Sequence, residues 1–119
     1  MKTILLVDDS TSIRNIVKGS LVREYNVVEA EHGEDALQKM AAGAQVDLFL
    51  LDVNMPVMDG LTLLGRIKAN PRFKTTPVLM LTTETKGERR AEAKALGASG
   101  WILKPCDPEQ LLGALKTFL

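Results

Sequence analysis

Residues 46–60 read VDLFLLDVNMPVMDG, and this stretch decides the fold. Its first six residues are almost all apolar, which is typical of a strand covered by helices on both faces of a parallel sheet. The run nevertheless ends on a charged residue, Asp52. A carboxylate at the end of a buried strand needs an explanation, and the rest of the chain supplies one.

Similar short apolar runs alternate with amphipathic stretches along the whole sequence. This alternation predicts repeated strand-helix units, and therefore an α/β fold built on a parallel sheet. We expect the strands to cover residues 3–7, 26–29, 47–51, 78–82 and 101–103.

Five helices fit between and after these strands. The first is expected to start near Thr11 or Ser12, both capable N-caps, and to bury Ile13, Ile16, Val17 and Leu21. The second follows Gly33 and stops before Gly43.

The remaining three helices have clear stop or start signals. The third runs from about Gly60 and ends before Pro71, and the fifth begins at Asp107 with Pro108 in its first turn. The fourth covers about 86–96 and has a thin apolar stripe of Ala91, Ala95 and Leu96.

Length and composition exclude several classes of protein. A chain of 119 residues predicts one domain over residues 1–119. Fifteen basic and fifteen acidic residues leave no positive excess for binding nucleic acid. Cys106 is the only cysteine and His32 the only histidine, which excludes an internal disulfide and a histidine cluster for zinc.

No apolar run approaches membrane-spanning length, and the N-terminal run is too short for a signal peptide. We therefore expect a soluble cytoplasmic protein with no membrane partner.

Polar residues of interest stand at the carboxyl ends of four of the strands. They are Asp8 and Asp9, Asp52, Thr82, and Lys104. In an open parallel sheet, ligands bind outside the carboxyl ends of the strands, so these side chains are expected to meet.

Three carboxylates that converge at one edge repel one another unless a cation relieves the charge. Ligation by oxygen alone suits Mg²⁺ or Mn²⁺. A carboxylate, a divalent cation, a hydroxyl and a lysine are equipped for phosphoryl transfer onto the carboxylate. Asp52 is the better acceptor because it stands alone, whereas the adjacent Asp8 and Asp9 suit a metal.

The sequence resembles the response-regulator receiver domains of two-component signalling. The resemblance rests on LLVDDS at 5–10, LLDVNMPVMDG at 50–60, LMLTT at 79–83 and WILKP at 101–105, in this order. It implies a flavodoxin-like sheet of five parallel strands in the order 2-1-3-4-5, with five helices on both faces.

The resemblance also implies a role for each matching residue. Asp52 is the phosphoacceptor, and Mg²⁺ or Mn²⁺ is held by Asp8, Asp9, Asp52 and the backbone carbonyl of Asn54. Thr82 bonds the attached phosphoryl group and Lys104 pairs with it. Pro105 matches a position where the family has a cis peptide.

Trp101 matches the aromatic residue that switches between two positions in the family. A half-buried tryptophan on an edge strand is also common packing, so both interpretations stay open.

The function implied is a phosphorylation-dependent switch and not an enzyme with its own substrate, apart from assisting its own phosphorylation and dephosphorylation. The donor is a sensor histidine kinase or a histidine phosphotransfer protein, docking near the first helix. The output partner is a separate protein that binds the face of helix four, strand five and helix five. A stand-alone regulator in chemotaxis is favoured, as a monomer or a phosphorylation-dependent dimer.

Three alternatives remain. A receiver of this kind can also be a phosphate sink or a phosphorelay intermediate. A phosphatase of the haloacid dehalogenase type shares the aspartyl-phosphate chemistry, but its nucleophile lies in a DxD motif after the first strand, where this chain has DD. A flavodoxin-like nucleotide binder would need a glycine-rich phosphate loop, which is absent after the first strand.

Overall fold

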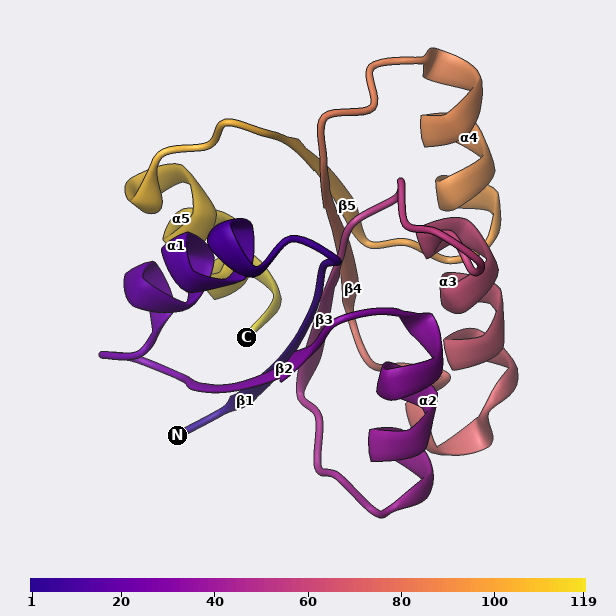
Figure 1. Cartoon of the computed structure of the whole chain (residues 1–119), viewed down its shortest axis with the longest axis horizontal. Coiled ribbons are helices and arrows are strands. Elements are labelled where there is room, and N and C mark those ends of the chain that lie inside the picture. The colour runs from indigo at the N-terminus through magenta and orange to yellow at the C-terminus, as the bar shows by residue number, and fades with distance from the viewer.

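The computed structural model describes residues 1–119, and its elements alternate between strand and helix (Figure 1). The strands are β1 (Thr3–Val7), β2 (Asn26–Ala30), β3 (Leu48–Leu51), β4 (Val78–Thr82) and β5 (Gly100–Leu103). The helices are α1 (Thr11–Leu21), α2 (Gly33–Ala41), α3 (Gly60–Ala69), α4 (Gly87–Ala95) and α5 (Pro108–Phe118), with a short 3₁₀ helix η1 (Pro71–Phe73). The predicted α/β class is confirmed.

All strand pairs are parallel, and the strand order is β2-β1-β3-β4-β5. The predicted flavodoxin-like order 2-1-3-4-5 is therefore confirmed. Strand β3 lies in the centre between β1 and β4, and all four of its residues are buried. The order reverses direction between β1 and β3, and this switch point is where open α/β sheets bind ligands.

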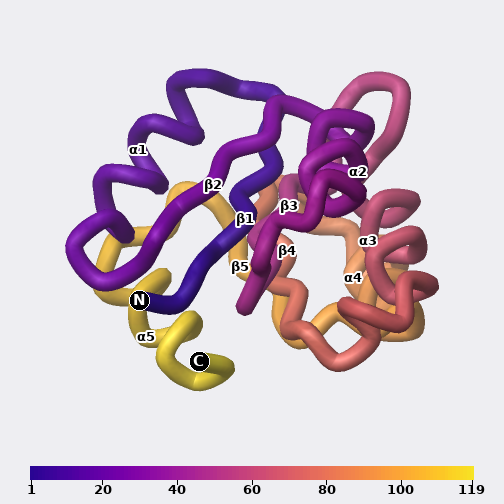
Figure 2. Tube along the Cα trace, turned by 90° about the horizontal axis from the view of Figure 1, so that it is seen from below, coloured from indigo at the N-terminus to yellow at the C-terminus, as the bar shows by residue number.

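Helices cover both faces of the sheet. Helices α1 and α5 lie on one face, and α2, α3 and α4 lie on the other (Figures 1 and 2). Alternate residues of each central strand enter opposite cores because side chains point to opposite faces of a strand. Leu5 and Phe49 join the core under α2–α4, whereas Ile4 and Leu48 join the core under α1 and α5.

Two expectations about α1 are wrong. The N-cap is Ser10, not Thr11 or Ser12, because the Ser10 side chain accepts a hydrogen bond from the Ile13 N–H. Ile16 was expected in the core but is 67% exposed. The three-and-four spacing of Ile13, Ile16 and Val17 covers a stripe that is wider than the buried face of the helix.

The predicted apolar stripe of α4 is also wrong. Ala91, Ala95 and Leu96 are exposed, and Ala93 is the one buried residue of this helix. Helix α4 has no large apolar side chain, and its alanines lie on several sides among charged residues. The sequence therefore did not define which face of α4 packs on the sheet. Helix α5 packs on the sheet through Leu111 and Leu115.

The sequence did not predict η1, which closes the connection from α3 to β4. Arg72 in this turn donates hydrogen bonds to the carbonyl oxygens of Met40, Gly43 and Ala44. Those carbonyls belong to the C-terminal end of α2 and the loop after it, so a single guanidinium joins two connections. None of the helices combines the length and the apolar character that a membrane span requires.

Candidate functional site

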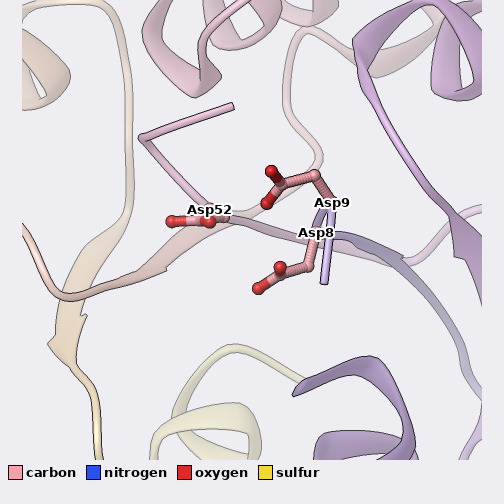
Figure 3. Close-up of side chains that lie close together, drawn as sticks. All are labelled: Asp8, Asp9 and Asp52. Atoms are coloured by element: carbon pink, nitrogen blue, oxygen red, sulfur yellow. The ribbon is translucent and has the colours of Figure 1, made fainter. Parts of the chain in front are cut away.

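Three carboxylates meet at the carboxyl edge of the sheet. Asp8 and Asp9 follow β1 and Asp52 follows β3, and one oxygen atom from each lies within 4.8 Å of the others (Figure 3). Asp8 is 2% exposed and Asp52 is 8% exposed, whereas Asp9 is open to solvent. The convergence expected from the strand ends is present.

The backbone at the site continues the hydrogen bonding of the sheet. The Asp8 N–H donates to the Ala30 carbonyl, and the Asp52 N–H donates to the Val7 carbonyl. On the other side the Lys104 N–H donates to the Thr82 carbonyl. These residues therefore stand on a rigid sheet edge and not on free loops, which fixes the directions of their side chains.

Lys104 comes from the edge strand β5 and reaches the carboxylates. Its Nζ lies 2.7 Å from Asp8 Oδ2 and 3.6 Å from Asp52 Oδ2. The ammonium therefore pairs mainly with Asp8 in this structure. The peptide bond between Lys104 and Pro105 is cis.

The burial of Asp52 affects its ionisation. Desolvation raises the pKa of Asp52 above its ordinary value, the nearby Lys104 ammonium lowers it, and the neighbouring Asp8 carboxylate raises it. Smaller lowering effects come from the Asn54 N–H and the Thr82 hydroxyl, and the net pKa is raised. A raised pKa means that the ionised form of this buried carboxylate is destabilised. A bound cation or a new covalent group on the carboxylate can remove that destabilisation.

The donor atoms of the cluster fit a hard divalent cation. Every side chain in it offers carboxylate oxygen, with no thiol or imidazole among them. Oxygen ligands of this kind suit Mg²⁺ and Mn²⁺, and exposed Asp9 leaves one side open for water ligands. Asn54 lies two residues beyond Asp52, on the loop that follows β3.

Thr82 ends β4, is fully buried, and accepts a hydrogen bond from the Glu84 N–H through its Oγ1. Trp101 on β5 is half-buried and lines a surface hollow together with Arg90, Ala93 and Lys94 of α4. The hydroxyl and the aromatic residue therefore stand on neighbouring strands, at the edge that faces α4.

The loop after β3 is tied down at its far end. Asp59 caps α3 by accepting from the Thr62 N–H, and Arg89 of α4 donates to the same carboxylate at 3.1 Å. Gly60 then passes so close to Asp52 that a β-carbon there would lie 2.0 Å from the Asp52 carbonyl oxygen. Only glycine allows α3 to begin against the backbone of Asp52.

An apolar groove of about 330 Å³ lies between α1 and the β5–α5 connection. Exposed Ile16 lies on its wall with Ile13, Pro105 and Cys106, and Lys104 and Thr83 connect it to the carboxylate cluster. The exposed apolar face of α1 therefore borders the site directly.

Sequence reasoning missed Arg14, Arg89 and the packing role of Gly60. Arg14 donates to the backbone carbonyl of Asp8, and Arg89 reaches Asp59 from a different helix. Neither contact has a local sequence signal, because an arginine on an amphipathic helix normally faces solvent. The sequence did place the start of α3 near Gly60, but it gave no sign of the close approach to Asp52.

Comparison with known proteins identifies the family. Residues 4–116 match the family model of the response regulator receiver domain. The chain belongs to this family. Members are signalling proteins that interact with histidine kinases and output proteins, not typical enzymes, and generally bind Mg²⁺.

Several relatives of this receiver match it over nearly its full length. The chemotaxis protein CheY1 of Helicobacter pylori strain J99 is 39% identical over 98% of this chain and 95% of its own. A CheY homolog of Campylobacter jejuni is 35% identical over 98% of this chain and 91% of its own.

Solved structures agree with the fold. The chemotaxis protein CheY4 of Vibrio cholerae, crystallised at low pH, superposes with a TM-score of 0.94 at 46% identity, covering 100% of this receiver and 99% of its own chain. The receiver domain of a histidine kinase from Syntrophus aciditrophicus superposes at 0.90 with 30% identity, covering 100% and 90%.

Proposed function

We propose that this receiver accepts a phosphoryl group on Asp52 from a phosphohistidine donor and thereby changes its affinity for a separate output protein. The observation that carries the proposal is the buried Asp52 carboxylate beside Asp8, Asp9 and Lys104. Such a group combines a fixed nucleophile with positive charge close to where the phosphoryl oxygens would lie.

Each residue of the site has a distinct task in this proposal. An Asp52 oxygen attacks the phosphorus, and the bond to the donor imidazole breaks. Asp8, Asp9, Asp52 and the Asn54 carbonyl would hold Mg²⁺ or Mn²⁺, and the bound ion would neutralise charge on the transferring group. Lys104 pairs with the phosphoryl oxygens afterwards, and the Thr82 hydroxyl donates to another of them. Water entering the same site would remove the group, so the protein assists its own dephosphorylation.

The donor protein is proposed to dock on the α1 side of the site. The groove bordered by Ile13, Ile16 and Pro105 offers an apolar surface next to Lys104. A histidine kinase or a histidine phosphotransfer protein that covers this groove would place its phosphohistidine at the open side of the cluster, where Asp9 is exposed.

The output surface is proposed to be the face of α4, β5 and α5. New phosphoryl oxygens would attract Thr82, which ends β4, and Lys104, which follows β5, and so bias the arrangement of this face. Trp101 would report on this change, because it stands on β5 and lines a hollow together with residues of α4. Fluorescence of Trp101 is expected to change when beryllofluoride, a mimic of the aspartyl phosphate, is added; an unchanged spectrum would reduce Trp101 to a packing residue.

We propose a chemotaxis pathway, because the named relatives from Helicobacter pylori, Campylobacter jejuni and Vibrio cholerae are chemotaxis proteins. The receiver would work in the cytoplasm as a single unit over residues 1–119, as a monomer or a phosphorylation-dependent dimer. The likeness to a receiver domain of a histidine kinase favours a phosphorelay or phosphate-sink role as the second candidate. An output protein that binds only the phosphorylated form would support the chemotaxis role over the phosphorelay or phosphate-sink role.

Intact-mass measurement after incubation with acetyl phosphate and Mg²⁺ tests the proposal. The wild type is expected to gain one phosphoryl group, and Asp52→Asn is expected to gain none. Asp47→Asn is the matched control, because Asp47 lies at the other end of the same strand and accepts from the Thr3 N–H. A wild type that never gains the group, or an Asp52→Asn variant that does, would overturn it.

A further inference from the structure

Arg14 lies behind the carboxylate cluster and has no part in the proposed phosphoryl transfer. It is the fourth residue of α1, and its side chain is only 12% exposed. One guanidinium contacts three different segments of the chain. Nη1 donates to the backbone carbonyl of Asp8, Nη2 donates to Thr11 Oγ1 at 3.3 Å, and Nε pairs with Glu29 Oε1 at 3.3 Å.

These contacts complete the support of Asp8. Its backbone N–H bonds to Ala30, its Oδ1 accepts from the Ser10 N–H, and its Oδ2 accepts from Lys104. The carbonyl is the remaining polar group, and Arg14 supplies its donor. Because Glu29 lies on the neighbouring strand β2, Arg14 joins the end of β1 to β2. This contact lies where the acidic loop, residues 8–10, leaves the sheet.

We propose that Arg14 is a positioning residue for the cation site and acts through the backbone of Asp8. This inference rests on the proposed metal site, but it assigns a role to a residue outside it. Groups that orient a metal ligand commonly change metal affinity by tenfold or more when they are removed. The planar guanidinium suits the task because it bonds in several fixed directions at once, which an ammonium group does not.

Electrostatics alone predicts the opposite result. Removing a positive charge beside three carboxylates makes the site more negative, and a divalent cation should then bind more tightly. Loss of the guanidinium also leaves Glu29 without this partner, which adds to the same effect. A weaker site after removal of Arg14 can therefore only come from lost positioning.

Lys18 offers a matched control. Its Nζ lies 3.2 Å from Glu29 Oε2, so it pairs with the same carboxylate as Arg14, and that is its only ion pair. It makes no hydrogen bond to Asp8. Lys18→Met removes a charge from the same neighbourhood while leaving the support of the acidic loop intact.

Binding of Mn²⁺ can be measured from the loss of the free-ion signal in electron paramagnetic resonance, with Mg²⁺ added as a competitor. Arg14→Met is expected to raise the Kd for Mn²⁺ by about tenfold. Arg14→Lys keeps the charge and is expected to fall between wild type and Arg14→Met. Lys18→Met is expected to bind as the wild type does, or slightly more tightly.

Two outcomes overturn the proposal. If Arg14→Met and Arg14→Lys bind Mn²⁺ as tightly as the wild type or more tightly, Arg14 does not position the site. If the wild type itself binds no ion, the proposed cation site fails as well, so the two failures are distinguishable. Arg14→Lys keeps the test usable if Arg14→Met does not fold.

Discussion

At the amino edge of the sheet, where the strands begin, three charged side chains bond to the backbone, whereas at the carboxyl edge two buried carboxylates lie side by side. Asp47 accepts from the Thr3 N–H, and Arg72 and Lys68 donate to backbone carbonyls. At the other edge Asp8 and Asp52 crowd together with Lys104 as their shared partner. Charge at the first edge joins loops and stabilises the fold, whereas charge at the second edge is left available for chemistry.

Lys104→Met tests the carboxyl edge and should lower the unfolding free energy more than any other substitution proposed here. Removing the ammonium leaves two buried carboxylates without their cation, and breaking a buried pair costs about 3 kcal/mol of unfolding free energy. Denaturant titration with and without Mg²⁺ measures it. We expect Mg²⁺ to recover most of the loss, because the ion replaces the missing charge.

Lys116→Met is the control for this prediction. Lys116 pairs with Glu24 on the surface, where ion pairs contribute little. Equal losses in Lys104→Met and Lys116→Met, or a loss that Mg²⁺ does not reduce, would contradict the distinction between the two edges.

Arg72→Met tests the amino edge. It removes three hydrogen bonds to backbone carbonyls and should lower the unfolding free energy by about 2 kcal/mol. The same variant should bind Mn²⁺ with the wild-type Kd. A change in ion affinity would mean that the two edges are coupled, and the comparison would need revision.

The main elements of this fold could be predicted from the sequence, and the faces of two helices could not. The run that ends at Asp52 indicates its strand because Leu48–Leu51 are four consecutive apolar residues, and all four are buried in the structure. In α4, small and charged residues alternate with little apolar contrast, so Ala93 could not be distinguished from Ala91 and Ala95. In α1, Ile16 satisfies the helical spacing and yet remains exposed beside the site.

The convergence of the carboxylates was easier to predict than the contacts that support them. Parallel strand ends meet at one edge, and five site residues stand at or directly after such ends: Asp8, Asp9, Asp52, Thr82 and Lys104. The contacts of Arg14 with Asp8 and of Arg89 with Asp59 join side chains and backbone from different elements. Only the packed structure determines such contacts.

A smaller effect on stability is expected from Asp52→Asn without metal. Burial raises the pKa of Asp52 in the folded protein above its value in the unfolded chain. The unfolding free energy therefore declines as the pH rises from the unfolded-state pKa through the folded-state pKa. The variant lacks this penalty and should be more stable by about 1 kcal/mol at neutral pH.

The pH dependence distinguishes this cause from a general packing effect. Below the ordinary pKa the wild-type carboxyl is protonated in both states, so the difference between the two proteins should disappear in acid. Thermal melts of both proteins over a pH series provide the check. A difference that stays constant with pH would argue against stored charge at Asp52.

The smallest expected effect concerns Val57, in the loop after β3. Its φ of 69° lies in the left-handed region, which a β-branched residue rarely adopts. Val57 is also fully exposed, so no packing contact offsets the strain. Val57→Asn should therefore raise the unfolding free energy by about 0.5–1 kcal/mol. An equal or lower stability would show that the loop is not strained there.

The position of the phosphoryl group tests the central proposal most directly. After incubation with acetyl phosphate and Mg²⁺, reduction of the protein with borohydride marks the modified aspartate permanently, and peptide mass spectrometry then locates it. We predict a single mark on Asp52, with Asp8 and Asp9 unmodified. A mark on Asp8 or Asp9, or no mark on any aspartate, would contradict the assignment of Asp52 as the phosphoacceptor.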